Sequence, residues 1–455
     1  MKLRDVAFKA YDVRGLYPEE VNEELAYRVG KILVHKLNAK KIVVGYDIRL
    51  SGPTMLKTLA EGITDAGAQV VNIGQCGTEM VYFATYHTQA DGGVMITASH
   101  NPKEYNGMKL VREGARPISA DTGLKEIGKL ATSADFPRVL DTGVTKGKIS
   151  NLDIMPAYIE KLLSFVDVKK LKPMKLVVNP GNGGAGPIFK ELAKYLPFEY
   201  VMLNGKPDGN FPNGVPNPML LKNRKETAEQ VVASGADLGI SWDGDFDRCF
   251  LFDAKGNFVD AYYIIGLLAE VFLAKQAGAK IMYDPRLRWN AEEIIERLGG
   301  KKVIYKSGHA FMKQCMRDVG VLYGGESSAH HYFRDFTCCD SGMLPWLLVC
   351  QYLCSSGKTL EEAVGERMAM FPVSGEINRK VSNAGEILAQ LEAKYSSGIV
   401  DKIDGLSVAY RDWRFNVRTS NTEPVMRLNV ETRGDKKLLE EKTAELLAVI
   451  GGEEA

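Results

Sequence analysis

The chain has 455 residues, enough for about three or four domains of ordinary size. Its content of 45% hydrophobic and 25% charged residues is ordinary for a soluble globular protein. The net charge of +1 excludes a protein that binds nucleic acid through a strong overall positive field, while a local basic cluster stays compatible with it.

The sequence also indicates the cellular compartment and which classes of partner to expect. The first residues, Met-Lys-Leu-Arg-Asp, are charged and lack the apolar segment of a secretory signal. No run approaches the roughly 18 apolar residues that a membrane span requires, and residues 342–354 instead predict a buried helix. The seven cysteines follow no disulfide or metal-site spacing. We therefore expect a cytoplasmic protein with reduced thiols, no membrane contact and no nucleic-acid partner.

Strand and helix patterns alternate from the start of the chain, which predicts a mostly parallel sheet covered by helices. The first strands and helix are expected at residues 41–47, 54–66 (the helix), 69–74 and 92–97. Later strands and helices are expected at residues 176–179, 238–242, 262–276 (helix), 280–284, 290–298 (helix) and 302–305. The scheme restarts along the chain, and we expect four domains at residues 1–150, 151–255, 256–370 and 371–455.

The strand at residues 92–97 runs into Thr-Ala-Ser-His-Asn-Pro, residues 97–102, which we call the serine loop. Pro102 cannot continue a ladder, so we expect Ser99 to be presented in a loop at the end of this strand. In open α/β sheets the carboxyl ends of the strands are the usual place for ligands.

Three acidic residues, Asp243, Asp245 and Asp247, alternate in a second loop at residues 243–248, the aspartate loop. Their oxygens can surround one hard cation such as Mg²⁺, Ca²⁺ or Mn²⁺. A calcium EF-hand does not fit, because Arg248 stands at position six instead of Gly and Ala254 at position twelve instead of Glu. The alternative is a solvated acidic turn, which the preceding apolar strand disfavours.

Two further polar loops follow. Residues 325–331, the sugar loop, offer the carboxylate of Glu326 and the hydroxyl of Ser328, which suit the hydroxyls of a pyranose. Residues 418–427, the phosphate loop, are rich in donors that suit phosphate. The donors are the side chains of Arg418, Ser420, Asn421, Thr422 and Arg427. The alternative is a surface strand whose arginines are neutralised by Glu423 and Glu431.

These four loops, in this order along the whole chain, resemble those of the α-D-phosphohexomutases, and more narrowly those of bacterial phosphomannomutases. The resemblance implies an α/β fold with three similar mixed α/β domains and a smaller C-terminal α+β domain around a central cleft. Two positions depart from the usual pattern: Phe246 stands where relatives often have Gly, and Ser327 where they usually have Met or Glu.

The resemblance also implies an isomerase that interconverts mannose 6-phosphate and mannose 1-phosphate. A phosphorylated Ser99 would donate its phosphoryl group, a bound 1,6-bisphosphate would turn around, and Ser99 would recover the other phosphate. A hexose 1,6-bisphosphate would act as activator, and the product would supply GDP-mannose synthesis. One Mg²⁺ per chain would be held by Ser99 and the three aspartates of the aspartate loop.

The same resemblance assigns the remaining roles. Ser99, His100, Lys109 and Arg248 would be catalytic, with either His100 or Lys109 as the proton acceptor or donor. The phosphosugar would be bound by Arg14, His309, Glu326, Ser328, Arg418, Ser420, Asn421, Thr422 and Arg427.

Three alternatives stay open from the sequence. The enzyme could be a phosphoglucomutase or accept both glucose and mannose phosphates, since the two sugars differ only at C2. A non-catalytic sugar-phosphate sensor is disfavoured because Ser99 and the aspartates are present, and a phosphoserine-type hydrolase would release inorganic phosphate. The sequence leaves a monomer and a dimer equally open.

Overall fold

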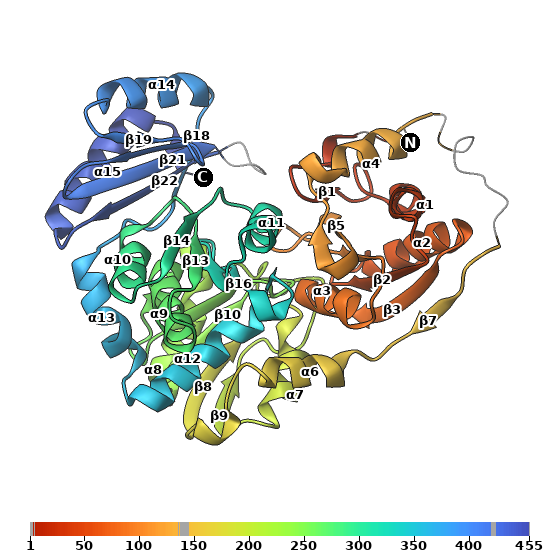
Figure 1. The fold of residues 1–455 in the computed structure, drawn as a ribbon, viewed down its shortest axis with the longest axis horizontal. Coiled ribbons are helices and arrows are strands. Elements are labelled where there is room, and N and C mark those ends of the chain that lie inside the picture. The colour runs from red at the N-terminus through yellow and green to blue at the C-terminus, as the bar shows by residue number, and fades with distance from the viewer. Residues whose placement is uncertain (1–2, 4, 135, 137–144, 420–424, 455) are drawn as a thin grey trace. The chain divides into compact units, whose positions relative to one another are not determined.

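The computed structural model describes residues 3, 5–134, 136, 145–419 and 425–454 (Figure 1). It forms two compact units. The first holds the chain up to Phe258 together with Tyr332–Gly357, and the second holds Val259–His331 and the chain from Lys358 onward.

The first unit begins with a seven-stranded sheet in the order β1-β5-β4-β2-β3-β7, with β6 beside β5. β2 pairs in parallel with β3 and β4, and β5 pairs antiparallel with β4 and β1, so the sheet is mixed. Its strands are β1 (Val13–Leu16), β2 (Lys41–Tyr46), β3 (Gln69–Gln75), β4 (Gly92–Ile96), β5 (Tyr105–Arg112), β6 (Arg116–Pro117) and β7 (Ile149–Asn151). The predicted strands at 41–47, 69–74 and 92–97 are confirmed to within one residue at each end.

Among the described residues, the helices that accompany this sheet are α1 (Glu23–Leu37), α2 (Gly52–Asp65), α3 (Thr78–His87) and α4 (Leu124–Ala131). Asn22 caps α1 by accepting a hydrogen bond from the backbone N–H of Leu25 at 3.0 Å. Pro53 occupies the first turn of α2, where its missing N–H costs nothing. The apolar faces of α1 and α2 pack with the inner strands into one core, which fixes the strand ends that carry the site.

The second sheet of this unit has the order β12-β11-β10-β8-β9. β10 is parallel to β8 and antiparallel to β11. The strands are β8 (Met174–Asn179), β9 (Phe198–Met202), β10 (Leu238–Trp242), β11 (Cys249–Phe252) and β12 (Phe258–Val259). The helices beside them are α6 (Met155–Leu163), α7 (Ala185–Ala193) and α8 (Lys225–Ser234).

A distant segment completes the first unit. It contains the short strands β16 (His331–Phe333) and β17 (Cys339–Asp340) and the helix α12 (Met343–Ser356). The side chains of α12 from Met343 to Cys350 are all buried, which confirms the helix predicted at 342–354. Trp242 at the end of β10 donates its indole N–H to the carbonyl of Gly342 at 2.8 Å, so α12 begins against the strand that leads into the aspartate loop.

The second unit contains a parallel set of strands in the order β14-β13-β15. Its elements are α9 (Ala261–Lys275), β13 (Lys280–Tyr283), α10 (Trp289–Arg297), β14 (Lys301–Ile304), α11 (His309–Val319), β15 (Tyr323–Gly325) and α13 (Leu360–Met370). The strands and helices predicted between residues 262 and 305 are all confirmed within one residue at each end.

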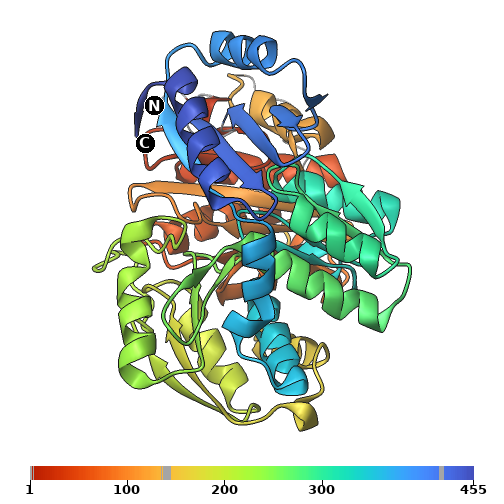
Figure 2. The same ribbon diagram turned by 90° about the vertical axis from the view of Figure 1, so that its left-hand side faces the viewer.

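The C-terminal part of this unit is an antiparallel sheet in the order β19-β20-β21-β22-β18-β23. The strands are β18 (Ile377–Lys380), β19 (Ile399–Asp401), β20 (Leu406–Ala409), β21 (Trp413–Thr419), β22 (Val425–Thr432) and β23 (Glu453–Glu454). Helices α14 (Ala384–Lys394) and α15 (Lys436–Ile450) pack on this sheet, and Figure 2 shows the dark-blue α15 running beside it.

The predicted fold class is confirmed by these sheets: mixed α/β layers come first and a smaller α+β domain comes last. All seven cysteines are free thiols. None of the helices in the described part of the chain combines the length and the apolar character needed to cross a membrane. The four domain boundaries and the central cleft stay predictions.

Candidate active site

Ser99 lies just beyond β4, as the sequence predicts, and its hydroxyl meets a carboxylate and an imidazole. Its Oγ donates to Oδ2 of Asp243 at 2.9 Å and lies 3.0 Å from Nδ1 of His100. Ser99 adopts a φ of 50°, a left-handed conformation that costs a residue with a side chain about 1 kcal/mol or more. The serine loop therefore holds the hydroxyl in one strained, defined position.

The aspartate loop follows β10 and brings its three carboxylates together. One ligand oxygen from each of Asp243, Asp245 and Asp247 lies within 4.8 Å of the others, and all three side chains are buried. Gly244 allows the aspartate loop to pack closely on the serine loop, because a Cβ at position 244 would lie 2.6 Å from the carbonyl oxygen of Ser99. The sequence prediction that these aspartates form one cluster is borne out among the described residues.

Phe246, the unusual residue of this loop, is fully buried with a φ of 47°. That backbone conformation favours glycine, and Phe246 offsets its cost by burying its ring. The ring packs so closely on Gly77 that a Cβ at position 77 would lie 2.1 Å from it. The ring thus joins the aspartate loop to the start of α3.

Two buried cations balance the carboxylates. The Lys109 ammonium, on β5, lies 2.7 Å from Oδ2 of Asp245 and 2.6 Å from Oδ2 of Asp247. Arg248 donates from Nε to Oδ2 of Asp243 at 2.8 Å and also contacts Nδ1 of His100. Burial acts to lower the pKa of Lys109, but the two carboxylates outweigh it and raise that pKa above its ordinary value.

The carboxylates of this cluster fit a divalent cation. Three negative charges face two positive ones, so one negative charge remains in a site that excludes water. Burial raises the pKa of Asp243 to about 6, although Arg248 acts to lower it. The ionised carboxylates are thus incompletely neutralised, and a bound cation would stabilise them. Oδ1 of Asp245 is buried and has no hydrogen-bond partner among the described residues. Hard cations such as Mg²⁺ bind carboxylate oxygens, and this oxygen atom is free to serve as a ligand.

Arg14, on β1, reaches the same region through the serine loop. Its Nη1 donates to Oδ1 of Asn101 at 3.0 Å, and its Nη2 pairs with Asp12. The side chain is almost wholly buried. The structure thus brings five predicted residues of this unit, besides the aspartates, to one place: Arg14, Ser99, His100, Lys109 and Arg248.

Sequence reasoning missed the residues that anchor this cluster from α3. The hydroxyl of Thr78 donates to Asp245, and its backbone N–H donates to the carbonyl of Asp245 at 3.2 Å. The next residue, Glu79, is fully buried and accepts from Tyr158, from the hydroxyl of Ser341 at 2.7 Å and from the first amides of α12. Only the sequence position of Thr78 and Glu79, at the start of a helix after Gly77, could have drawn attention to them.

The buried carboxyl group of Glu79 makes the stability of the protein depend on pH. Burial raises the pKa of Glu79 from 4.5 to about 8, although four donors oppose this shift. A raised pKa in the folded state means that the folded protein holds the proton more tightly, so Glu79 costs stability as pH rises from about 4.5 to about 8. We expect the stability advantage of wild type over Glu79→Gln to shrink across this window, by at most about 1.4 kcal/mol per pH unit.

Urea unfolding of both proteins at several pH values would measure this difference. Glu160→Gln, on the partly exposed face of the neighbouring α6, is the matched control and should show no such pH dependence. A wild-type advantage that grows with pH would mean that the four donors win over burial.

The sugar loop lies in the second unit, after β15. Glu326 is buried and accepts from the backbone N–H of Gly308 at 2.8 Å. Ser328 lies 3.1 Å from Nδ1 of His330, and the ring of His330 stacks at 6.3 Å from that of His309. The structure therefore brings the predicted residues Glu326, Ser328 and His309 together within this unit.

Arg418 and Arg427 are directly opposite each other on β21 and β22. Their charges are shared by Glu376, which lies 3.1 Å from Nη1 of Arg427 and 3.9 Å from Nη2 of Arg418. Burial and the nearby Arg286 lower the pKa of Arg418. Ser420, Asn421 and Thr422, the other predicted members of the phosphate loop, lie outside the described residues.

Arg286 and Glu376 connect the two loops of this unit, and sequence reasoning missed both. The guanidinium of Arg286 lies 3.5 Å from Glu326, 3.4 Å from the hydroxyl of Ser328 and 3.3 Å from Glu376. Asp284 holds Arg286 in place through two hydrogen bonds of 3.0 and 2.9 Å. The alternative that Glu431 neutralises the arginines of the phosphate loop is not supported, because Glu431 pairs with Arg414 at 2.7 Å.

Family models match nearly the whole chain. Those for the phosphoglucomutase/phosphomannomutase alpha/beta/alpha domains I, II and III match residues 5–138, 156–256 and 260–371, and that for the C-terminal domain matches residues 376–449.

Individual proteins agree with this assignment. A phosphomannomutase of Escherichia coli is 53% identical over 452 residues, covering 97% of this chain and 98% of its own. A protein named phosphohexose mutases from Xanthomonas campestris is 54% identical over 448 residues, covering 98% and 99%. The crystal structure of a phosphoglucomutase/phosphomannomutase family protein from Burkholderia thailandensis superposes with a TM-score of 0.87 at 29% identity, covering 98% of both chains. With its serine loop, aspartate cluster and four matched domains, this chain belongs to the phosphoglucomutase/phosphomannomutase family.

Proposed function

We propose that this protein is a Mg²⁺-dependent phosphomannomutase that interconverts mannose 6-phosphate and mannose 1-phosphate. The observation that carries the proposal is the hydrogen bond from Ser99 Oγ to Asp243, which places a nucleophilic hydroxyl on the carboxylate cluster. The E. coli phosphomannomutase, at 53% identity, supports the choice of reaction. Phosphorylated Ser99 would give its phosphoryl group to the free hydroxyl of the substrate and would recover the other phosphate from the 1,6-bisphosphate.

The residues around Ser99 fit this transfer. Asp243 accepts the hydrogen bond of the Ser99 hydroxyl and thereby orients Oγ. Phosphoryl transfer needs mainly positioning and positive charge. Arg248 pairs with Asp243, the partner of the Ser99 hydroxyl, and Lys109 pairs with Asp245 and Asp247, so both supply fixed cations to the carboxylate cluster.

The proton acceptor can be chosen between the two candidates. Lys109 is held between two carboxylates that raise its pKa, so it keeps its proton at neutral pH and serves as a cation. Nδ1 of His100 faces the guanidinium of Arg248, which can only donate, so this nitrogen carries a lone pair. We therefore assign proton transfer to His100 and charge stabilisation to Lys109.

Asp243, Asp245 and Asp247 would hold Mg²⁺, together with an oxygen on phosphorylated Ser99. The cation would neutralise charge on the transferring phosphoryl group when it is bound. The unused Oδ1 of Asp245 and the excess negative charge of the cluster support this assignment.

Glu326, Ser328 and His309 would bind the sugar hydroxyls, with Arg14 as a further ligand of the phosphosugar. Arg418, Arg427, Ser420, Asn421 and Thr422 would bind the phosphate that does not react. Two arginines in direct cross-strand register repel each other. Glu376 pairs with both but is shared with Arg286, and Asp404 lies 4.0 Å from Nε of Arg418. A phosphate dianion would relieve the repulsion between the two guanidinium groups, which supports a phosphate site and not a plain surface strand.

Arg418→Ala tests this assignment. Each lost hydrogen bond to a charged group costs about 1.5 to 3 kcal/mol, so kcat/KM for the phosphosugar should fall about 10- to 100-fold, with a higher KM. Ser99 phosphorylation by added bisphosphate should be at least partly retained. Arg411→Ala removes an exposed arginine of the same sheet domain and is the matched control. Steady-state kinetics with an unchanged KM for Arg418→Ala would contradict the phosphate site.

A second candidate is a dual-specificity mutase for mannose and glucose phosphates. The Xanthomonas relative, 54% identical, carries the broader name phosphohexose mutases, and this favours the alternative. Measuring both mutase activities of the purified enzyme, with a trace of each bisphosphate as activator, separates the two. A phosphomannomutase has the larger kcat/KM for mannose 1-phosphate, equal values indicate dual specificity, and activity with neither sugar rejects both.

The remaining parts of the proposal concern the setting. The enzyme would work in the cytoplasm, where its seven free thiols stay reduced, and its product would supply GDP-mannose synthesis. The chain would form four domains around one cleft, named here by their loops: the serine domain (residues 1–150), the aspartate domain (151–255), the sugar domain (256–370) and the phosphate domain (371–455). A sensor or hydrolase is a weaker proposal, because the nucleophile and all three carboxylates are intact.

A further inference from the structure

Arg49 holds the backbone of the serine loop. Its Nη2 donates to the carbonyls of Ser99 at 3.0 Å and Asn101 at 2.6 Å, and its Nη1 to those of Pro102 at 2.6 Å and Tyr105 at 2.8 Å. All four terminal N–H groups of the guanidinium are thus used on one short segment of chain. With 2% of its surface exposed, Arg49 makes these bonds where water cannot replace them.

The carboxylate of Asp47 and the hydroxyl of Thr97 connect Arg49 to the backbone N–H of Ser99. Asp47, at the end of β2, lies 3.3 Å from Nε of Arg49 and accepts from the Arg49 backbone N–H at 2.9 Å. The same carboxylate accepts from the Thr97 hydroxyl at 2.7 Å, and that hydroxyl accepts from the backbone N–H of Ser99 at 2.8 Å. Both the N–H and the C=O of Ser99 are therefore set by the pair Asp47 and Arg49.

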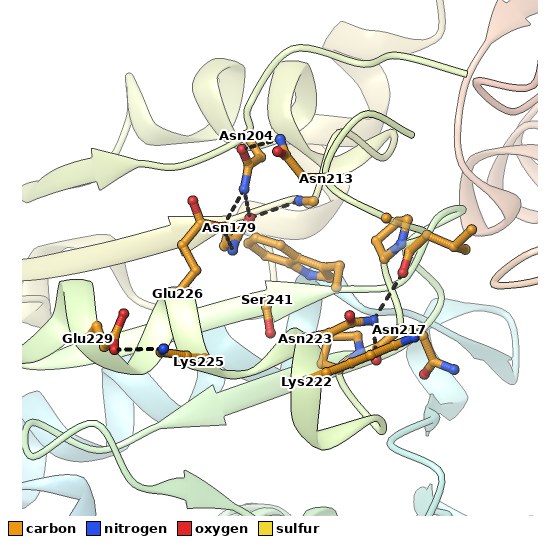
Figure 3. A pocket seen from close by; sticks show the side chains of 16 residues that line it. Asn179, Asn204, Asn213, Asn217, Lys222, Asn223, Lys225, Glu226, Glu229 and Ser241 are labelled. Atoms are coloured by element: carbon orange, nitrogen blue, oxygen red, sulfur yellow. Dashed lines mark hydrogen bonds and ion pairs between the residues drawn. The ribbon is translucent and has the colours of Figure 1, made fainter. Parts of the chain in front are cut away.

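A loop of the second sheet closes the remaining face of Arg49. The ring of Phe211 lies 5.4 Å from the guanidinium carbon. Asparagines hold this loop: Asn213 donates to Asn182 at 2.9 Å and to Asn204 at 2.8 Å. Figure 3 shows Asn179, Asn204 and Asn213 pointing toward one another at the edge of a cavity of about 330 Å³. These hydrogen bonds fix the loop that carries Phe211, and Phe211 in turn packs on Arg49.

The consequence for Ser99 follows from the strain in its backbone. A left-handed φ at a serine persists only where its surroundings impose it, and here the surroundings are Arg49 and the backbone of Gly244. We propose that Arg49 is a positioning residue that sets the place of Ser99 Oγ on the carboxylate cluster. It acts through four backbone carbonyls and contacts no reacting atom. This role rests on the proposed mutase function.

Arg49→Lys keeps the charge but loses the fork that reaches four carbonyls. A misplaced nucleophile lowers the chemical step, so we expect kcat to fall about 10²-fold. The KM for the phosphosugar should change less than about threefold, because the residues assigned to bind sugar and phosphate are untouched. Amide hydrogen exchange of residues 97–105 should speed up in the variant without substrate, and exchange in α1 and α2 should stay as in wild type.

The matched control is Arg28→Lys. Arg28 also donates to two backbone carbonyls, those of Ala131 and Ser133 at 3.1 and 3.0 Å, in the same unit but away from the serine loop. It should keep wild-type kcat even if its unfolding temperature falls as much as that of Arg49→Lys. Phe211→Leu, which leaves the guanidinium intact but loosens its support, should show a smaller kcat loss at unchanged KM, and it carries the test if Arg49→Lys does not fold.

Two results overturn the inference: a kcat within about twofold of wild type in the variant that folds, or equal kcat losses in the Arg49 and Arg28 variants. A wild-type enzyme without mutase activity on either sugar would instead reject the proposed function. The exchange of residues 97–105 then still decides whether Arg49 holds the loop.

Discussion

Ser99→Ala should lose mutase turnover by about 10⁴-fold or more, because no other hydroxyl replaces a nucleophile that has been removed. Intact-mass measurement of the wild-type enzyme should show one added phosphate, and peptide mapping should place it on Ser99. The variant should still bind phosphosugar, since the residues assigned to sugar and phosphate binding, apart from Arg14, belong to the second unit.

Ser241→Ala is the matched control for this experiment. Ser241 is buried on β10, two residues before Asp243, and its hydroxyl has no hydrogen-bond partner among the described residues. Its removal should leave turnover and phosphate content close to wild type. Unmodified wild-type protein combined with an active Ser99→Ala enzyme would rule out a phosphoserine mechanism.

The second large effect is expected at the aspartate loop. Asp245→Asn removes a full negative charge and replaces one oxygen donor by an amide, so Mg²⁺ affinity should drop and kcat should fall by about 10²-fold or more. Asp243→Asn and Asp247→Asn should act in the same direction, because each removes one charge from the same cluster. Titration calorimetry with Mg²⁺ and steady-state rates over a range of Mg²⁺ concentrations measure both effects.

Asp253→Asn gives the control for removing a buried carboxylate. Asp253 accepts from the backbone amides of Lys255 and Asn257, both at 2.9 Å, in a turn outside the cluster. It should lose some stability and keep its Mg²⁺ titration. If all three loop variants titrate as wild type does, the cation does not bind at the aspartate loop.

The local elements of the fold follow from short-range pattern. β10, for example, begins and ends where its mostly apolar run does, because all five of its residues are buried in the sheet. α12 was predicted from its composition alone, yet its packing with the first unit depends on contacts more than 180 residues apart in the chain, such as that between Cys354 and Lys172. Such contacts leave no periodic signal in the sequence.

The residues of the site likewise divide into those that the sequence predicts and those that only the structure reveals. The three aspartates could be predicted because their spacing is itself the chemical signal, and Ser99 because its loop and three others, in order, resemble those of the phosphohexomutases. Arg49, Thr78 and Glu376 could not, because each acts on a partner that is distant in sequence, and a lone arginine, threonine or glutamate in a helix or loop has many ordinary explanations. Glu431 illustrates the same limit: its position beside the phosphate loop left it open as a partner of the loop's arginines, but the register of β21 and β22 places it opposite Arg414.

One measurement tests the central claim most directly. Enzyme carrying ³²P on Ser99 is mixed with an excess of unlabelled mannose 6-phosphate and quenched after a single turnover. The account predicts that the label moves from the protein into the 1,6-bisphosphate and the hexose monophosphates, with no matching release of inorganic phosphate. Label that appears as inorganic phosphate, or that stays on the protein while product forms, would contradict it.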